Sequence, residues 1–229
     1  MTTKTQPVAR KKRVLLVDDH PMMRQGIAQL INQQQDLEVC CEAGNAPQAA
    51  RFIDSSQPDL AIVDVSLEGS SGLELIKDIH VRHPRVVVLV LSMHEESIYA
   101  ERMLHAGARG YVMKNAGGET VLKAVRQVLD GRVYVSEKMS ARLLDSLAAP
   151  KSRASHSPIH GLSDREFEIF ELLGEGKTTL EIASHLHLSP KTVDTHRSHI
   201  KQKLELQTAT ALVRYAVRWT ETQDQGLTL

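Results

Sequence analysis

The first half of the chain alternates short aliphatic runs with longer stretches of helical apolar spacing, and this alternation restricts the possible folds most. Continuous aliphatic runs are typical of strands that are buried on both faces of a parallel sheet. Strands that alternate with helices form βαβ units, so the pattern predicts an α/β domain around a doubly wound five-stranded parallel sheet. The expected strands are 14–18, 37–43, 60–64, 86–92 and 110–113, and the expected helices are about 21–34, 46–55, 72–81, 95–106 and 118–130.

The length and charge of the chain set further limits. At 229 residues it exceeds the ~100–150 residues of a usual domain, which favours two domains. Lys plus Arg and Asp plus Glu are balanced at 28 each, so binding to nucleic acid would need a local basic patch. The longest purely apolar run, residues 86–91, is too short to span a membrane, and no apolar segment follows the basic N-terminus. We therefore expect a cytoplasmic protein with no membrane association.

The two cysteines, Cys40 and Cys41, are adjacent in one expected strand. Successive side chains of a strand point to opposite faces, so the two sulfurs should diverge and should not easily form a bridge. We expect reduced thiols and no metal site there.

Residues 146–161 are rich in Ser, Ala and Pro without apolar periodicity, which is typical of a linker. We therefore expect a first domain over 12–135, a linker with a helix over 136–160, and a second domain over 161–221. The linker helix should span 137–147, because four apolar residues share one face. These residues are Met139, Leu143, Leu144 and Leu147.

Three helix start signals follow the linker. Ser163-x-x-Glu166 and Thr178-x-x-Glu181 both fit the capping box, and Ser189-Pro190 places a cap before a proline at the first helical position. The segment therefore predicts a small all-α domain of three helices separated by tight turns, with a fourth helix at about 208–219.

Polar side chains follow the expected strands of the first domain. Asp18 and Asp19 end the first strand, and Asp64 ends the third. In an open parallel sheet the carboxyl ends of strands collect functional groups near the point where strand order reverses. Clustered carboxylates need a cation, and hard oxygen ligands favour Mg²⁺. Ser92 ends the fourth strand and Lys114 follows the fifth, so the same edge should also offer a hydroxyl and an ammonium.

The ordered set VDDHP (17–21), Asp64, Ser92 and YVMK (111–114) resembles the flavodoxin-like receiver domain of bacterial response regulators. The resemblance implies that Asp64 accepts a phosphoryl group from a histidine kinase, with Ser92 and Lys114 as catalytic partners. It also implies Mg²⁺ held by Asp19, Asp64 and the backbone carbonyl of Ser66, with Asp18 acting through water. Ser92 and Tyr111 would form the conformational switch, and only self-phosphorylation and self-dephosphorylation chemistry would be expected.

The chain departs from the family pattern after Asp64. The family usually carries Met-Pro where this chain has Leu67 and Glu68, so restoring Met-Pro should change the rate of phosphorylation or dephosphorylation.

A flavodoxin-like cofactor carrier is the nearest alternative for this sheet. It would need Gly, Ser or Thr donors after the first strand to bind phosphate, whereas Asp18 and Asp19 repel phosphate without a metal.

The second domain resembles the LuxR-type helix-turn-helix, and the combination resembles the NarL/FixJ class of response regulators. The residues that match are Leu162, Glu166, Gly176, Glu181, Ile182, Ala183, Leu186, Ser189, Thr192, Val193, His196, Ile200, Lys203 and Leu204. This resemblance implies binding to double-stranded DNA and a homodimer when the protein is phosphorylated.

Residues 189–204 supply the local basic patch, with four basic residues and one acidic residue. Helical spacing predicts that Val193, Ile200 and Leu204 are buried and that the opposite face enters the major groove. The outward residues expected at bases are Lys191, Asp194, Thr195 and Ser198, and those expected at phosphates are Thr192, Arg197, Lys201 and Lys203.

Two features of this domain leave alternatives open. His196 lies on the expected buried face, so a packed histidine is at least as favoured as a DNA ligand, and the His196/His199 pair lacks the further ligands of a zinc site. The last helix carries an apolar stripe that could pack within its own domain or pair two copies. The stripe consists of Leu212, Val213, Ala216 and Val217.

The sequence thus predicts a two-component transcription regulator whose DNA binding is controlled by phosphorylation of Asp64. Two other classes remain open: a receiver that signals through protein contacts, and an aspartate-dependent phosphatase. Binding that weakens steeply with salt would favour DNA over protein contacts, because phosphate contacts release counterions.

Overall fold

The computed structural model describes residues 10–67, 70–148 and 158–224. Contacts group the chain into two compact units, one of residues 1–93 with 103–136 and the other of residues 94–102 with 137–229. Among the described residues, no helix is both long and apolar enough to cross a membrane.

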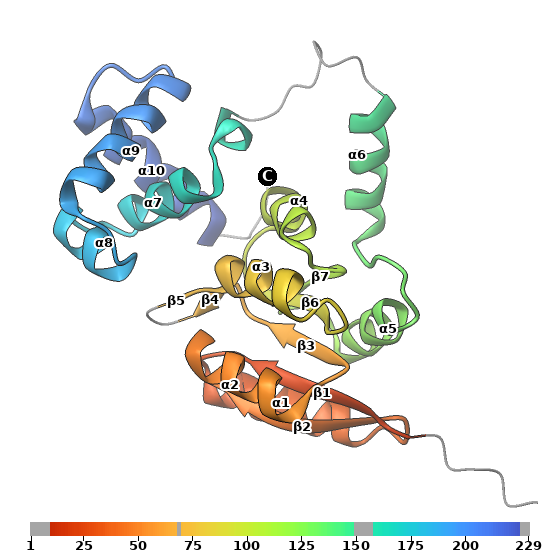
Figure 1. Cartoon of the computed structure of the whole chain (residues 1–229). Coiled ribbons are helices and arrows are strands. Elements are labelled where there is room, and N and C mark those ends of the chain that lie inside the picture. The colour runs from red at the N-terminus through yellow and green to blue at the C-terminus, as the bar shows by residue number, and fades with distance from the viewer. Residues whose placement is uncertain (1–9, 68–69, 149–157, 225–229) are drawn as a thin grey trace, which may run out of the picture. The chain divides into compact units, whose positions relative to one another are not determined.

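A five-stranded sheet forms the centre of the first unit. All its strands are parallel, in the order β2-β1-β3-β6-β7 (Figure 1). The strands are β1 (Lys12–Val17), β2 (Leu37–Ala43), β3 (Leu60–Val63), β6 (Val87–Ser92) and β7 (Gly110–Met113). The predicted sheet is confirmed, and its strand order reverses beside β1, so β1 and β3 are neighbours.

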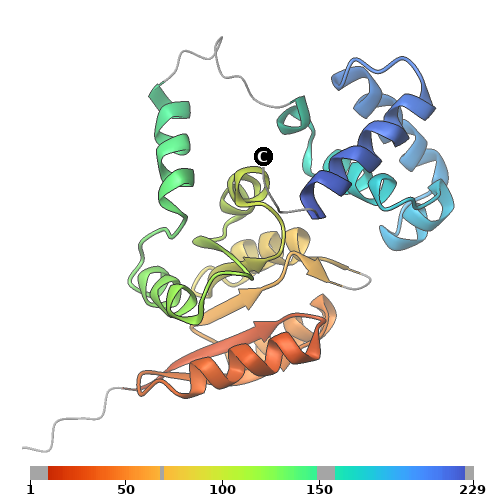
Figure 2. The same ribbon diagram turned by 180° about the vertical axis from the view of Figure 1, so that it is seen from behind.

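Helices cover both faces of the sheet, which Figures 1 and 2 show from opposite sides. The helices of this unit are α1 (Pro21–Asn32), α2 (Ala46–Ser56), α3 (Gly72–Arg82) and α5 (Gly118–Leu129), whereas α4 (Glu96–Ala106) is divided between the two units. Alternate strand residues such as Val14 and Leu16 form one buried cluster with Ile31 of α1 and Val125 of α5. Their neighbours Leu15 and Val17 are also buried, so β1 is covered on both faces, as its continuous apolar run predicts.

A short hairpin after β3 was not predicted from the sequence. β4 (Ser66–Leu67) pairs antiparallel with β5 (Ser70–Ser71), and the side chain of Leu67 is buried. Glu68, the other position where the sequence departs from Met-Pro, lies outside the described residues. The effect of restoring Met-Pro stays a prediction.

The expectation that the two cysteine side chains diverge is wrong. Val14 pairs with Val39 and Leu15 with Cys41, so Cys40 is the extra residue of a β-bulge in β2. A bulge interrupts the alternation of side chains, and the sulfurs of Cys40 and Cys41 lie 3.2 Å apart as free thiols.

We predict slow alkylation of Cys41 in the native protein. Burial and the neighbouring Cys40 thiol raise the pKa of Cys41 to about 12, so at pH 8 the reactive thiolate is scarce and becomes common only as pH approaches that value. Mass spectrometry after brief iodoacetamide treatment at pH 8 should show far less modified Cys41 in the native protein than in urea. Equal rates in the two states would contradict the burial argument.

The linker helix is close to its predicted bounds, but its apolar face is only partly buried. α6 (Glu137–Ala148) buries Met139, whereas Leu144 is 66% exposed. The side chain of Leu147 lies outside the described residues. A short helical turn, η1 (Pro158–Gly161), leads to the remaining helices.

The second unit contains the four predicted C-terminal helices, α7 (Asp164–Gly174), α8 (Thr179–His185), α9 (Pro190–Lys203) and α10 (Ala209–Asp224). Both capping boxes are present in full, and the Ser189 hydroxyl accepts from the Thr192 amide at the start of α9. Leu212 and Ala216 of α10 are fully buried, so these two members of the apolar stripe serve the core of this unit.

Candidate functional site

Two carboxylates meet where β1 and β3 end. Asp18 directly follows β1 and Asp64 directly follows β3, and the Asp64 amide donates to the Val17 carbonyl at 2.8 Å. Both residues are buried, with 7% of Asp18 and 3% of Asp64 exposed. Buried carboxylates of this kind need paired or hydrogen-bonded surroundings, because burial removes the water that stabilises their charge.

Lys114 supplies that pairing. Its ammonium lies 2.6 Å from Asp64 Oδ2 and 2.7 Å from Asp18 Oδ2, and its side chain is 4% exposed. The Lys114 amide donates to the Ser92 carbonyl at 2.7 Å, which fixes the residue between the ends of β6 and β7. One ammonium group therefore bridges two buried carboxylates.

The pKa values of the bridged groups reflect a balance of burial and pairing. Burial raises the pKa of Asp64, and the Lys114 ammonium offsets this only in part. Burial alone would lower the pKa of Lys114, but its hydrogen bonds to Asp18 and Asp64 outweigh burial and raise it. Lys114 therefore stays protonated at neutral pH and can stabilise further negative charge.

Local hydrogen bonds hold the two carboxylate loops. The His20 amide donates to Asp18 Oδ1 at 2.8 Å, and the Ser66 amide donates to Asp64 Oδ1 at 3.2 Å. Arg24 of α1 donates to the Asp18 carbonyl at 2.5 Å. Sequence reasoning did not include His20 or Arg24 in the site, although His20 follows the acidic pair directly.

Gly72 is a further position that the sequence did not single out. It begins α3, and its amide donates to the Val65 carbonyl at 3.1 Å. A Cβ atom at this position would lie 2.6 Å from the Val65 carbonyl oxygen and would also collide with the carbonyl oxygen of Asp64. The close approach of α3 to the Asp64 loop therefore requires glycine.

The acidic residues fit a hard divalent cation. One potential ligand atom from each of Asp18, Asp19, His20 and Asp64 lies within 4.8 Å of the others. Carboxylate oxygens in this number suit Mg²⁺, which binds few protein ligands and retains water. His20 Nδ1 lies 2.6 Å from Asp19 Oδ1, so the histidine ring also borders this cluster.

Ser92 and Tyr111 lie on adjacent strands close to this edge. Ser92 is the last residue of β6, Tyr111 is the second residue of β7, and both are 0% exposed. The Tyr111 ring is therefore already inside the fold in this structure.

α9 has the two faces that the sequence predicts. Val193 and Ile200 are fully buried, whereas Leu204, at the C-terminal cap, is half-buried. The residues expected at DNA bases are all exposed, namely Lys191, Asp194, Thr195 and Ser198.

The hydroxyl groups on this face bond to carbonyls within the helix. Thr195 donates to the Lys191 carbonyl and Ser198 to the Asp194 carbonyl, each at 3.0 Å. Their oxygen lone pairs remain able to accept hydrogen bonds.

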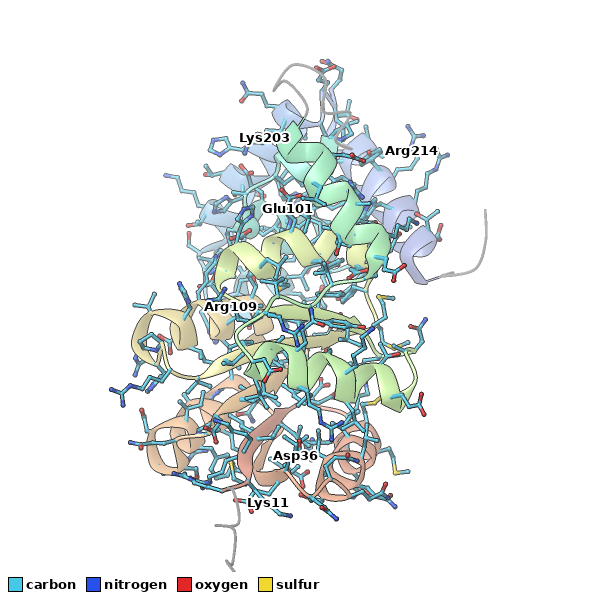
Figure 3. All side chains as sticks on the ribbon, turned by 90° about the vertical axis from the view of Figure 1, so that its right-hand side faces the viewer. Lys11, Asp36, Glu101, Arg109, Lys203 and Arg214 are labelled. Atoms are coloured by element: carbon cyan, nitrogen blue, oxygen red, sulfur yellow. The ribbon has the colours of Figure 1, made fainter. Side chains whose placement is uncertain are left out.

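Three residues expected at phosphates are engaged inside the unit. Lys203, labelled in Figure 3, places its ammonium 2.7 Å from Glu166 Oε2. The guanidinium of Arg197 hydrogen-bonds the Thr179 hydroxyl and lies 3.6 Å from Asp194 Oδ1. The Thr192 hydroxyl lies 2.7 Å from that of Ser189. Their contacts to DNA stay predictions. A phosphate contact by any of these three side chains would add to its internal interaction or replace it.

The fold and the buried Asp–Lys cluster, together with a helix-turn-helix, define a two-component response regulator with a DNA-binding domain. Residues 14–126 match the model of the response regulator receiver domain, and residues 160–216 match that of the luxR family of bacterial regulatory proteins. The oxygen regulatory protein NreC of Staphylococcus carnosus is 35% identical over 210 residues, which cover 90% of this chain and 97% of NreC. The chain belongs to the NarL/FixJ family of response regulators.

Solved structures agree with this assignment. RcsB from Salmonella enterica serovar Typhimurium, bound to promoter rprA in the presence of phosphomimetic BeF3−, is 25% identical with a TM-score of 0.69. That match covers 91% of this chain and 99% of the RcsB chain. A LuxR-family response regulator from Aurantimonas sp. is 30% identical with a TM-score of 0.57, over 61% of this chain and 100% of that chain.

Proposed function

We propose that Asp64 accepts a phosphoryl group from the phosphohistidine of a histidine kinase and that this modification controls binding of the second domain to DNA. The observation that carries the proposal is the buried Asp64 carboxylate, which follows β3 and is paired with the Lys114 ammonium at 2.6 Å. We assign residues 12–135 to the receiver domain, 136–160 to a linker with a helix, and 161–221 to the DNA-binding domain.

The chemistry follows from this arrangement. A carboxylate oxygen of Asp64 attacks phosphorus while the bond from phosphorus to the histidine nitrogen breaks, which leaves an acyl phosphate on Asp64. Lys114, held between Asp18 and Asp64, offsets the negative charge of the transferred group. Mg²⁺ held by Asp19, Asp64 and the Ser66 carbonyl, with Asp18 acting through water, would neutralise further charge on the phosphoryl oxygens.

The proposed role is regulatory rather than enzymatic. Self-phosphorylation and self-dephosphorylation are the chemistry that we assign to this site. The cytoplasmic location stays a prediction.

Ser92 and Tyr111 are proposed to connect the phosphoryl group to the rest of the domain. The Ser92 hydroxyl is at the end of β6, where it can turn toward a phosphoryl group on Asp64. Such a reorientation would change the packing around Tyr111 and bias a two-state surface near β6 and β7, favouring a homodimer.

The exposed face of α9 is proposed to read DNA in the major groove. Asp194, Thr195 and Ser198 would face base edges, with Lys191 beside them. The contacts to phosphate are assigned to Thr192, Arg197, Lys201 and Lys203. If two copies bind, their half-sites should lie about one helical turn, ~10 bp, apart.

We predict that Ser92→Ala will still accept phosphate on Asp64 but will lose most of the phosphorylation-dependent gain in DNA affinity. Thr195→Ala is the matched control, because it should keep that gain and change the preferred sequence instead. Fluorescence anisotropy titrations of both variants, with and without acetyl phosphate and Mg²⁺ at fixed salt, measure the gain. An undiminished gain in Ser92→Ala would contradict the proposed switch.

A salt series on the same DNA distinguishes the alternative of signalling through protein contacts. DNA affinity should fall steeply as salt rises, because each phosphate contact releases counterions. If the protein does not bind DNA even at low salt, signalling through protein contacts is favoured instead.

A further inference from the structure

Two histidines of α9 and one glutamate of α7 converge on the same side of the second unit. His196 and His199 are three positions apart on α9, so their side chains project from the same part of the helix surface. Glu166 occupies the third position of α7 and is 4% exposed. One potential ligand atom from each of the three residues lies within 4.8 Å of the others.

The two carboxylate oxygens of Glu166 have different surroundings. Oε2 accepts from the Ser163 amide at 2.7 Å and from the Lys203 ammonium at 2.7 Å. Oε1 faces His199, and the distance from Oε1 to His199 Nδ1 is 3.9 Å. The capping box and the ion pair therefore use one oxygen, and the other lies toward His199.

His196 adds an independent observation. Its Nδ1 atom is buried and has no hydrogen-bond partner among the described residues. A buried polar atom is normally satisfied by protein, water or an ion. The two histidine rings are close to perpendicular, with centroids 6.5 Å apart.

We propose that Glu166, His196 and His199 form a binding site for a divalent transition-metal ion of the Zn²⁺ class. Imidazole nitrogens with a carboxylate oxygen are a ligand set that suits this class, and three protein ligands leave one position for water. With metal–ligand bonds of about 2.0–2.2 Å, the ligand atoms of one tetrahedral ion lie ~3.3–3.6 Å apart. The three side chains must therefore move closer together to bind the ion, and the His199 side chain, which is 56% exposed, is able to move.

The sequence alone offered only the two histidines, and the fold adds Glu166 from a helix 30 residues earlier in the chain. The site is separate from the acidic cluster around Asp64, which offers mainly hard oxygen ligands. A bound ion would link α7 to α9, the helix whose exposed face we assign to DNA.

The test uses the full chain, stripped with a chelator and titrated with Zn²⁺ against a chromophoric competitor in excess Mg²⁺. His199→Ala should weaken binding of one equivalent of Zn²⁺ by at least about tenfold, because even outer partners of ligands contribute 10–100-fold to affinity. His105→Ala, an exposed histidine in the last turn of α4, is the matched control and should bind as the unaltered chain does.

Further variants separate the other groups that could hold Zn²⁺. Asp19→Asn alters the acidic cluster and Cys40→Ser alters the thiol pair. Neither substitution should abolish binding of the one equivalent of Zn²⁺ assigned to Glu166, His196 and His199. Zn²⁺ should also raise the unfolding temperature of the unaltered chain more than that of His199→Ala, whose fold circular dichroism checks. The proposal is overturned if His199→Ala keeps the equivalent at unchanged affinity, or if only Asp19→Asn or Cys40→Ser removes it.

Discussion

Replacing Asp64 with asparagine will abolish labelling of the protein by a small phosphodonor in the presence of Mg²⁺. The amide of asparagine lacks the anionic oxygen that attacks phosphorus, and no other group is proposed as acceptor. The fold should survive, because Asp64→Asn removes one buried negative charge while Lys114 keeps its ion pair with Asp18 at 2.7 Å. Mass spectrometry of the intact chain and of its peptides measures the extent and position of labelling.

Asp59→Asn is a matched control for this experiment. Asp59 precedes β3 at the opposite end from Asp64, and it pairs with Lys12 away from the carboxyl edge. Its variant should be labelled like the unaltered chain. Stoichiometric labelling that persists in Asp64→Asn would remove the assignment of Asp64 as phosphoacceptor.

The second large effect is expected at Gly72. Gly72→Ala forces a Cβ atom against the carbonyl oxygens of Asp64 and Val65, and backbone atoms cannot move aside as a flexible side chain can. We expect the free energy of unfolding to fall by about 1–3 kcal/mol, as for other overpacked positions. Labelling of Asp64 should also slow, because the displaced carbonyl belongs to the acceptor residue itself.

Gly26→Ala provides the control, since a Cβ atom at Gly26 of α1 would meet nothing within 4 Å. Alanine is favoured over glycine inside a helix, so this variant should gain about 0.5–1 kcal/mol. Urea unfolding of both variants, together with the labelling rate, separates a local clash from a general effect of alanine. Equal stability of the two variants would show that the Asp64 loop accommodates the added atom.

The predicted elements agree with the structure where the signals are local. Capping boxes, as at Ser163 and Glu166, involve groups within one turn of the chain, and apolar periodicity is a property of a single segment. The convergence of Asp18 and Asp64 was predictable for a related reason. Both residues follow strands of one parallel sheet, and carboxyl ends of parallel strands share an edge.

Other features depend on neighbours that are distant in the sequence, and the tertiary structure alone decided them. The bulge at Cys40 arises from the register between β2 and β1, and it overturned the expected divergence of the two thiols.

The same limit applies to side-chain pairing. The Lys114 bridge joins residues 50 positions apart, and the Lys203–Glu166 pair joins residues 37 positions apart. The need for glycine at Gly72 likewise comes from carbonyl groups that the fold brings against α3. The sequence by itself determined which segments form strands and helices and which edge collects the carboxylates. Packing decided which side chains pair there, because pairing depends on distances that only the assembled elements define.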